Sequence, residues 1–163
     1  MLRIKHLCFA YHEDHHIIKN LNMSVESGSL MLLTGKSGSG KTTFCEILSK
    51  KLTYREGHIF FDETEIKEIK DKNYFSKIHF IKQNPHHNFI GLNPERDFLL
   101  WNKKENLPLF IQSLEKYKLC GKNHELLWKM SFGEQKCVYF SYLEVIKRPL
   151  WVFDEPLEGV DSE

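Results

Sequence analysis

The chain has 163 residues, of which 41% are hydrophobic and 28% are charged, and its formal net charge is +1. These values are ordinary for one soluble globular domain with its own core, and the near-neutral charge argues against a large nucleic-acid surface. No apolar run is long enough to span a bilayer. We therefore expect a cytosolic protein without a nucleic-acid partner, whose membrane role, if it has one, comes through another subunit.

The N-terminal third of the sequence predicts three strands and then a helix. Leu2 to Phe9 alternates loosely and predicts a strand, Tyr11 to His16 predicts a turn, and Ile17 to Val25 predicts a second strand. The apolar run Leu30 to Leu33 predicts a buried strand. Apolar residues at helical spacing from Thr43 to Leu52 predict a helix.

A glycine-rich loop lies between this third strand and the helix, and it matches the phosphate-binding pattern G-x-x-x-x-G-K-[ST] without a mismatch. Glycines let the backbone approach a phosphate, and N–H groups at the helix N-terminus bind it. Lys41 would place a charge on the β- and γ-phosphates, and the Thr42 hydroxyl, with Thr43 beside it, would ligate Mg²⁺. The alternative is a loop that merely joins strand to helix. The matching residues are Gly35, Lys36, Ser37, Gly38, Ser39, Gly40, Lys41 and Thr42.

The middle of the chain predicts short elements and then a helical region. Gly57 to Asp62 predicts a strand, Ile66 to Lys70 a short helix, and Ile78 to Ile81 is another apolar run. Between residues 95 and 129, apolar residues recur at helical spacing and are punctuated by proline and glycine, which predicts a helical insert. Gly133 to Ile146 predicts a further helix.

A last apolar run, Leu150 to Phe153, predicts a buried strand that ends in two carboxylates. Asp154 would leave the strand near the phosphate loop and hold Mg²⁺, and Glu155 would polarise an attacking water. Taken alone, the pair could be two acids that meet solvent at a strand end. Parallel strands linked by helices around a phosphate loop predict an α/β nucleoside-triphosphatase.

These motifs, in this order, resemble the nucleotide-binding domain of ABC transporters along the whole chain. Tyr11 stands where that family has an aromatic residue that stacks on adenine, and Gln83 matches the Q-loop, which contacts Mg²⁺ and senses the membrane partner. Met130 to Gln135 resembles the family signature LSGGQ, and Asp154-Glu155-Pro156 resembles the Walker B end with its catalytic glutamate. Leu157 to Asp161 resembles the D-loop.

The resemblance implies one ATP-binding domain over residues 1–163, truncated after the D-loop, with a helical sub-domain at about 84–132 and the last core strands missing. Its fold would be an α/β P-loop core, mostly parallel, with an antiparallel N-terminal part. Two such domains, in a homodimer or a heterodimer, would enclose ATP and Mg²⁺ head to tail. Ser131 and the N–H of Gly133 would bind the γ-phosphate held by the opposite subunit, and Glu155 would orient the water.

An integral membrane transporter subunit would be driven through the helical insert, which would place the protein at the inner face of the cell membrane. The stretch Gln83 to His87, with Glu95 to Phe98 beyond it, is similar to ATPases of energy-coupling-factor and cobalt-type importers. This implies import, for example of a vitamin or a metal ion.

Two departures from the family pattern leave a second hypothesis open. Phe132 stands where the signature usually has glycine, which is unfavourable if that position requires φ > 0. No histidine follows Glu155, so none fills the family's switch position. The alternative is a subunit that binds nucleotide with little or no turnover, or a truncated remnant.

Simpler interpretations also remain open. Tyr11 is also compatible with a plain strand-end tyrosine, and Gln83 with a loop hydrogen-bonding residue. Ser131, with Glu134 three residues on, also predicts a capping box. A non-transport ABC ATPase for DNA repair would need a longer insert, and one for translation usually joins two such domains in one chain. A P-loop kinase or GTPase would leave the signature unexplained.

Overall fold

The structure is a computed structural model that describes residues 1–12 and 15–155. It divides into two compact units. The β unit comprises residues 1–80 and 149–154, and the helical unit comprises residues 81–148 with Glu155. The predicted D-loop, Leu157 to Asp161, lies outside the described residues.

The β unit contains a four-stranded sheet whose strands lie in the order β2-β1-β3-β4. β1 pairs antiparallel with both β2 and β3, and β3 pairs antiparallel with β4. The antiparallel N-terminal part that the sequence predicted is therefore confirmed. The strands are β1 (Leu2–Ala10), β2 (His16–Val25), β3 (Glu56–Phe61) and β4 (Thr64–Glu65).

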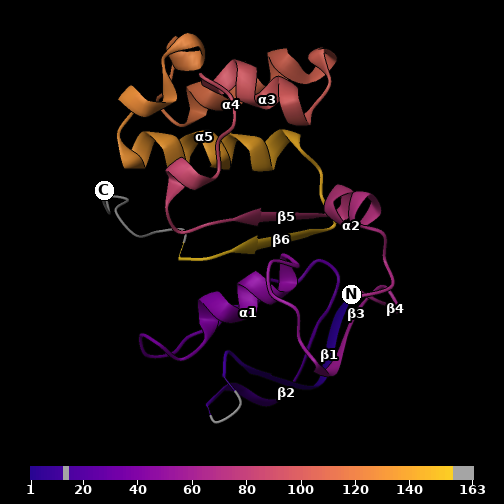
Figure 1. Cartoon of the computed structure of the whole chain (residues 1–163). Coiled ribbons are helices and arrows are strands. Elements are labelled where there is room, and N and C mark those ends of the chain that lie inside the picture. Colours follow the sequence, from indigo (N-terminus) through magenta and orange to yellow (C-terminus); the bar gives the residue numbers. More distant parts are fainter. Residues whose placement is uncertain (13–14, 156–163) are drawn as a thin grey trace. The chain divides into compact units, whose positions relative to one another are not determined.

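The rest of the β unit supplies two helices and a second, two-stranded sheet. Helix α1 (Lys41–Leu48) lies between the four-stranded sheet and the pair β5 (Ile78–Ile81) and β6 (Leu150–Phe153), whose arrows run in the same direction in Figure 1. Buried side chains of the four-stranded sheet, α1 and β5 form one apolar core. β6 confirms the predicted strand, although its residues are half-buried rather than fully buried.

The prediction of a buried strand at Leu30–Leu33 is wrong. These residues form no regular element, and the exposed fractions of their side chains are 95%, 43%, 82% and 41% along the run. A strand is formed by pairing, and neither sheet among the described residues includes this segment. Apolar composition therefore marks a segment that could pair, but a partner strand must be present before the segment becomes a strand.

The short helix predicted at Ile66–Lys70 is also wrong, because none of these residues is helical and the helix begins at Asp71. Residues 66–68 form a turn in which the buried Ile66 donates its N–H to the carbonyl oxygen of Ile59 at 2.8 Å. Helix α2 (Asp71–Lys77) follows, with an acidic residue in its first turn and a basic residue in its last. An acidic residue in the first turn and a basic residue in the last turn interact favourably with the helix dipole, which favours a helix over these residues.

The helical unit confirms the predicted helical insert and the helix that follows it. Figure 1 shows α3 (Pro94–Trp101) and α4 (Leu107–Lys116) along one side of α5 (Phe132–Val145). Its core is aromatic: the rings of Phe98 and Phe110 stack with their centroids 4.4 Å apart, and Tyr142 packs against both. Across the described residues, no helix is both long enough and apolar enough to cross a bilayer.

Candidate functional site

The phosphate loop has backbone geometry that requires glycine. Gly38 and Gly40 have φ angles of 77° and 93°, in the left-handed region. A Cβ on Gly40 would also lie 2.9 Å from Cγ2 of Ile17. Two independent constraints, conformation and space, therefore account for the glycine that directly precedes α1.

The first turn of α1 is open to an anion. Its N-cap residue, Gly40, provides no side-chain cap, and the first turn holds no acidic residue. The ammonium of Lys41 donates to the carbonyl oxygens of Gly35 at 2.9 Å and Lys36 at 3.2 Å, so a positive charge lies against the loop. Uncapped N–H groups, the positive end of the helix dipole and an ammonium together favour phosphate binding.

Thr42 and Asp154 are 112 residues apart in sequence but come together in the β unit. The Thr42 hydroxyl donates to Oδ1 of Asp154 at 3.1 Å, and Asp154 is 6% exposed. Mg²⁺ prefers oxygen ligands of this kind. The hydroxyl and carboxylate therefore fit the magnesium site that the sequence predicted, with Thr42 and Asp154 as its protein ligands.

The Cys45 thiol on the buried side of α1 is not a reactive group of this site. Burial, together with the nearby carboxylates of Asp154 and Glu46, raises the pKa of the Cys45 thiol to about 12. The thiol is therefore neutral at physiological pH and behaves as a small apolar side chain.

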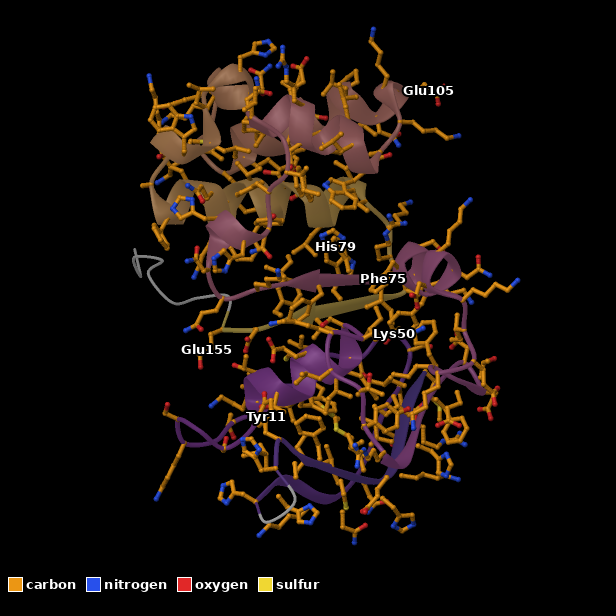
Figure 2. The ribbon with its side chains drawn as sticks, in the orientation of Figure 1. Tyr11, Lys50, Phe75, His79, Glu105 and Glu155 are labelled. Carbon is orange, nitrogen blue, oxygen red and sulfur yellow. The ribbon has the colours of Figure 1, made fainter. Side chains whose placement is uncertain are left out.

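Tyr11 lies next to α1 at the end of β1 (Figure 2). Its ring is 52% exposed and stands edge-on to Phe9, with the ring centroids 5.0 Å apart. The Tyr11 hydroxyl is 3.2 Å from Oγ1 of Thr43. The tyrosine is therefore tied to the helix that follows the phosphate loop while one part of its ring remains accessible, as base stacking requires.

In the helical unit, Gln83 and Glu155 form a direct pair. Nε2 of Gln83 donates to Oε2 of Glu155 at 2.9 Å. Glu155 has a φ angle of 49°, which is uncommon for a residue with a side chain. Six other non-glycine residues among those described also have a positive φ, so this conformation by itself does not mark Glu155 as functional.

The start of α5 confirms the predicted capping box. Ser131 Oγ accepts from the N–H of Glu134 at 3.2 Å, and Glu134 Oε2 accepts from the N–H of Ser131 at 2.7 Å. The ammonium of Lys122 also bonds to Glu134, and together with the Ser131 N–H it lowers the pKa of that carboxyl. The Ser131 hydroxyl proton is not used by the cap, so it can still donate to a ligand.

Phe132 does not strain the start of α5, because the condition under which a side chain would be unfavourable there, a positive φ, is not met. It is the first residue of α5, and positive φ values among the described residues do not include it. A side chain is therefore tolerated here, and the ring remains 49% exposed. Gly133 follows in the same turn of the helix.

Sequence reasoning missed Asp97, a fully buried carboxylate on α3. Its Oδ1 accepts from the N–H groups of Ile90 and Gly91, both at 2.7 Å, and its Oδ2 accepts from the Tyr142 hydroxyl at 2.8 Å. Asp97 thus fixes the segment that follows Gln83. Asp97 shares the buried stripe of α3 with Pro94 and Phe98, where an acidic residue is unusual, but this burial becomes visible only in the structure.

The predicted site residues therefore fall into two sets, one in each unit. The β unit brings together the phosphate loop, Tyr11 and Asp154, and the helical unit brings Gln83 to Glu155 and presents Ser131 on α5.

Comparisons with known proteins show which family the chain belongs to. A family model described as ABC transporter matches residues 18–158. A putative ABC transporter ATP-binding protein of Clostridium tetani is 27% identical over 170 residues, covering all of this chain but 38% of that relative. The chain thus spans well under half of that relative's length.

Two solved structures share the fold. CbiO1 from Clostridium perfringens, described as part of the ABC transporter complex cbiONQ, has a TM-score of 0.78 at 23% identity and covers 98% of this chain and 67% of its own. A bacterial Atm1-family ABC exporter with ATP bound has a TM-score of 0.84 at 19% identity, covering 99% of this chain and 30% of its own. Together with the family model, which spans most of the chain, these findings show that the protein belongs to the ABC transporter family as an ATP-binding domain with a P-loop NTPase fold.

Proposed function

We propose that the chain binds ATP with Mg²⁺ at its phosphate loop and serves as the energising subunit of an ABC-type membrane transporter. The observation that carries the proposal is the Thr42–Asp154 hydrogen bond at the start of an uncapped helix. It joins the end of the phosphate loop to the end of β6, so that oxygen ligands for a cation lie beside N–H groups suited to phosphate.

Each residue in the β unit has a distinct part in this proposal. Lys41 would leave the loop carbonyls for the β- and γ-phosphates, and the first-turn N–H groups of α1 would bind phosphate oxygens. The exposed ring of Tyr11 would stack on adenine. Bound Mg²⁺, held by Thr42 and Asp154, would neutralise phosphate charge.

Hydrolysis would use Glu155 as the group that orients and polarises water. Gln83 already donates a hydrogen bond to Glu155, which fixes one carboxylate oxygen and leaves the other free to accept from a water. The Ser131 hydroxyl and the Gly133 N–H, at the start of α5, would donate to the γ-phosphate of ATP bound to a second ATP-binding subunit, identical or different.

The membrane partner and the direction of transport form the finer part of the proposal. An integral membrane subunit would dock on the helical unit, and this would hold the chain at the inner face of the cell membrane. The stretch Gln83 to His87 supports import of a vitamin or a metal ion. Cellular uptake of such a solute that is lost on deletion of the gene would support import, and uptake that is unchanged would contradict it.

A turnover assay tests the enzymatic part. We expect Mg²⁺-dependent release of phosphate from ATP that Glu155→Gln abolishes, because an amide cannot act as the general base. Glu144→Gln is a matched control, because Glu144 is also a hydrogen-bonded carboxylate of the helical unit, paired with Ser113 and Lys116. Turnover that survives Glu155→Gln would contradict the role given to Glu155.

A nucleotide-binding subunit without turnover is the second candidate. The observation that favours it is Phe132, whose ring replaces a glycine between the two groups proposed to reach the opposite phosphate. ATP binding without hydrolysis, both alone and beside a partner ATPase, would favour this candidate. Hydrolysis abolished by Glu155→Gln would exclude it.

A further inference from the structure

Phe132 makes a specific contact with the segment that follows Gln83. Its ring stands edge-on to the imidazole of His86, with the ring centroids 4.9 Å apart and an interplanar angle of 88°. Edge-to-face geometry is the favourable arrangement for two such rings. His86 belongs to the short 3₁₀ turn η1 (Pro85–His87), so the contact joins this turn to the first residue of α5.

The segment around Gln83 is a closed loop, so movement at His86 is passed to Gln83. Asn88 closes the loop, because its Oδ1 accepts from the N–H of Lys82 at 2.8 Å and its Nδ2 donates to the Lys82 carbonyl at 3.0 Å. Inside it, Oδ1 of Asn84 accepts from the N–H of His86 at 3.0 Å. The Asn84 carbonyl also accepts from Nδ2 of Asn88 at 3.3 Å and from the N–H of His87 at 3.1 Å, so hydrogen bonds connect the backbone on either side of Gln83 to the turn that contains His86.

The far end of this segment is also attached to α5, but further along the helix. Phe89 stacks on Tyr139 with the ring centroids 4.6 Å apart. Asp97 accepts from the N–H of Gly91 and from the Tyr142 hydroxyl. A Cβ on Gly91 would lie 2.4 Å from the Asp97 nitrogen, so the loop and α3 are in close contact there. These contacts hold the loop against the middle of α5 whatever residue stands at position 132.

We propose that Phe132 is a positioning residue that couples Gln83 to the Ser131 cap by holding His86 against the start of α5. The inference rests on the proposed function. In that function, Gln83, paired with Glu155, would serve the nucleotide bound by its own subunit, whereas Ser131, at the start of α5, would serve the nucleotide bound by the opposite subunit. The ring therefore links the two ATP sites of the dimer through one polypeptide.

The replacement of glycine by phenylalanine then has a positive role. Glycine at position 132 would offer no side chain to His86, so this ring contact between η1 and the start of α5 would be lost. Phe132 has helical backbone and a half-exposed ring, so it adds this contact without backbone strain. We expect a displacement of Gln83 to alter the position of Ser131 through the Phe132 ring.

Nuclear magnetic resonance of the nucleotide-free chain tests the contact directly. We expect Phe132→Leu to shift the ring-proton signals of His86 and the side-chain amide signals of Gln83, because an aromatic ring current is lost and the loop is released. Phe140→Leu is the matched control, because Phe140 lies on the same helix and packs against Tyr117 instead. If Phe132→Leu leaves the Gln83 signals where Phe140→Leu leaves them, the proposal is overturned.

Kinetics tests the coupling in the dimer. Phe132→Leu and His86→Ala should each lower kcat about 2- to 12-fold, the range that an aromatic pair of ~0.5–1.5 kcal/mol gives at 1.36 kcal/mol per tenfold. ATP affinity should stay unchanged, and the double variant should be no slower than either single variant. His87→Ala, at the exposed neighbouring histidine, is the control.

The outcomes distinguish a failure of the Phe132–His86 coupling from a failure of the proposed ATPase function. Single effects that multiply in the double variant would overturn the coupling while leaving the proposed ATPase intact. A chain that binds no ATP would remove the proposed function, and the magnetic-resonance shifts would then decide the Phe132–His86 contact by themselves.

Discussion

The starts of helices α1 and α5 differ in whether side chains cap their first backbone N–H groups. Gly40 gives α1 no side-chain cap, whereas Ser131 and Glu134 form a complete capping box on α5. The uncapped start has N–H groups to offer to an anion, and the capped start is stable without one. The difference is consistent with the roles proposed above, phosphate binding at the start of α1 and presentation of the Ser131 hydroxyl at the start of α5.

The same contrast extends to what holds each helix in place. The eight-residue α1 has no side-chain cap in its first turn and no basic residue in its last, so burial of its apolar face is a main source of its stability. Side-chain hydrogen bonds from Tyr74 to the Leu48 carbonyl and from Thr42 to Asp154 also hold it. The fourteen-residue α5 has its cap, an ion-paired glutamate and the aromatic core of the helical unit. Variants at the two helices should therefore fail for different reasons.

The largest effect should come from the packing of α1. Leu48 is 2% exposed, so Leu48→Ala should lower the free energy of unfolding by about 2–5 kcal/mol, as buried leucines do. Leu32 lies just before the phosphate loop but is 82% exposed, so Leu32→Ala should cost no more than about 0.5 kcal/mol. Urea unfolding of both variants compares them. A large loss for Leu32→Ala would contradict its exposed position.

Gly40 tests the uncapped start itself. Gly40→Ala places a Cβ in the left-handed region, which costs about 1–2 kcal/mol, and brings it against Ile17 as well. Gly121→Ala is matched for conformation, with φ of 73°, but its Cβ would meet nothing within 4 Å. We expect Gly40→Ala to be the less stable variant in thermal unfolding and to bind ATP more weakly, whereas Gly121→Ala keeps its affinity. Equal losses in both variants would show that the contact with Ile17 has no effect.

Ser131 tests the capped start. Ser131→Ala should destabilise the helical unit by about 0.5–2 kcal/mol, the usual loss of a cap. Ser131→Asn, which retains a capping oxygen, should recover most of that stability. Urea unfolding followed by circular dichroism measures both. An alanine variant as stable as the wild type would mean that the capping box does not stabilise α5.

The smallest effect should be the pH dependence of this cap. Lys122 and the Ser131 N–H hold the pKa of Glu134 below its ordinary value, so the folded chain stabilises the charged carboxylate. That contribution is complete above the ordinary pKa and disappears as pH falls through the lowered value. The stability difference between wild type and Glu134→Gln should therefore be constant near neutral pH and vanish in acid. A difference that grows in acid would have the wrong sign.

Local hydrogen bonding explains why some of these features could be predicted from sequence. The glycines of the phosphate loop and the Ser131–Glu134 pair are set by residues within a few positions, so their patterns carry the geometry. The end of β6 could also be predicted, because Asp154 closes an apolar run, and the hydrogen bond from Thr42 confirms that the two segments meet. The family assignment rested on the order of such local motifs.

Non-local pairing explains what could not be predicted. Leu30–Leu33 has the composition of a buried strand, but whether it becomes one depends on a partner strand that composition does not reveal. The helix begins after the predicted range because the N–H of Ile66 donates to the carbonyl oxygen of Ile59 on β3, so Ile66 belongs to a turn. The roles of Asp97 and Phe132 depend on loop residues that only the fold brings near them.

The central claim is that the phosphate loop binds ATP, and calorimetric titration of the chain with ATP and Mg²⁺ tests it most directly. We expect saturable binding of one ATP per chain. Lys41→Ala should weaken it roughly 10- to 150-fold, since hydrogen bonds to a charged group contribute about 1.5–3 kcal/mol. Lys36→Ala, in the same loop, should have a smaller effect, because only its backbone faces phosphate in the motif. The absence of ATP binding, or binding that Lys41→Ala leaves unchanged, would contradict the account.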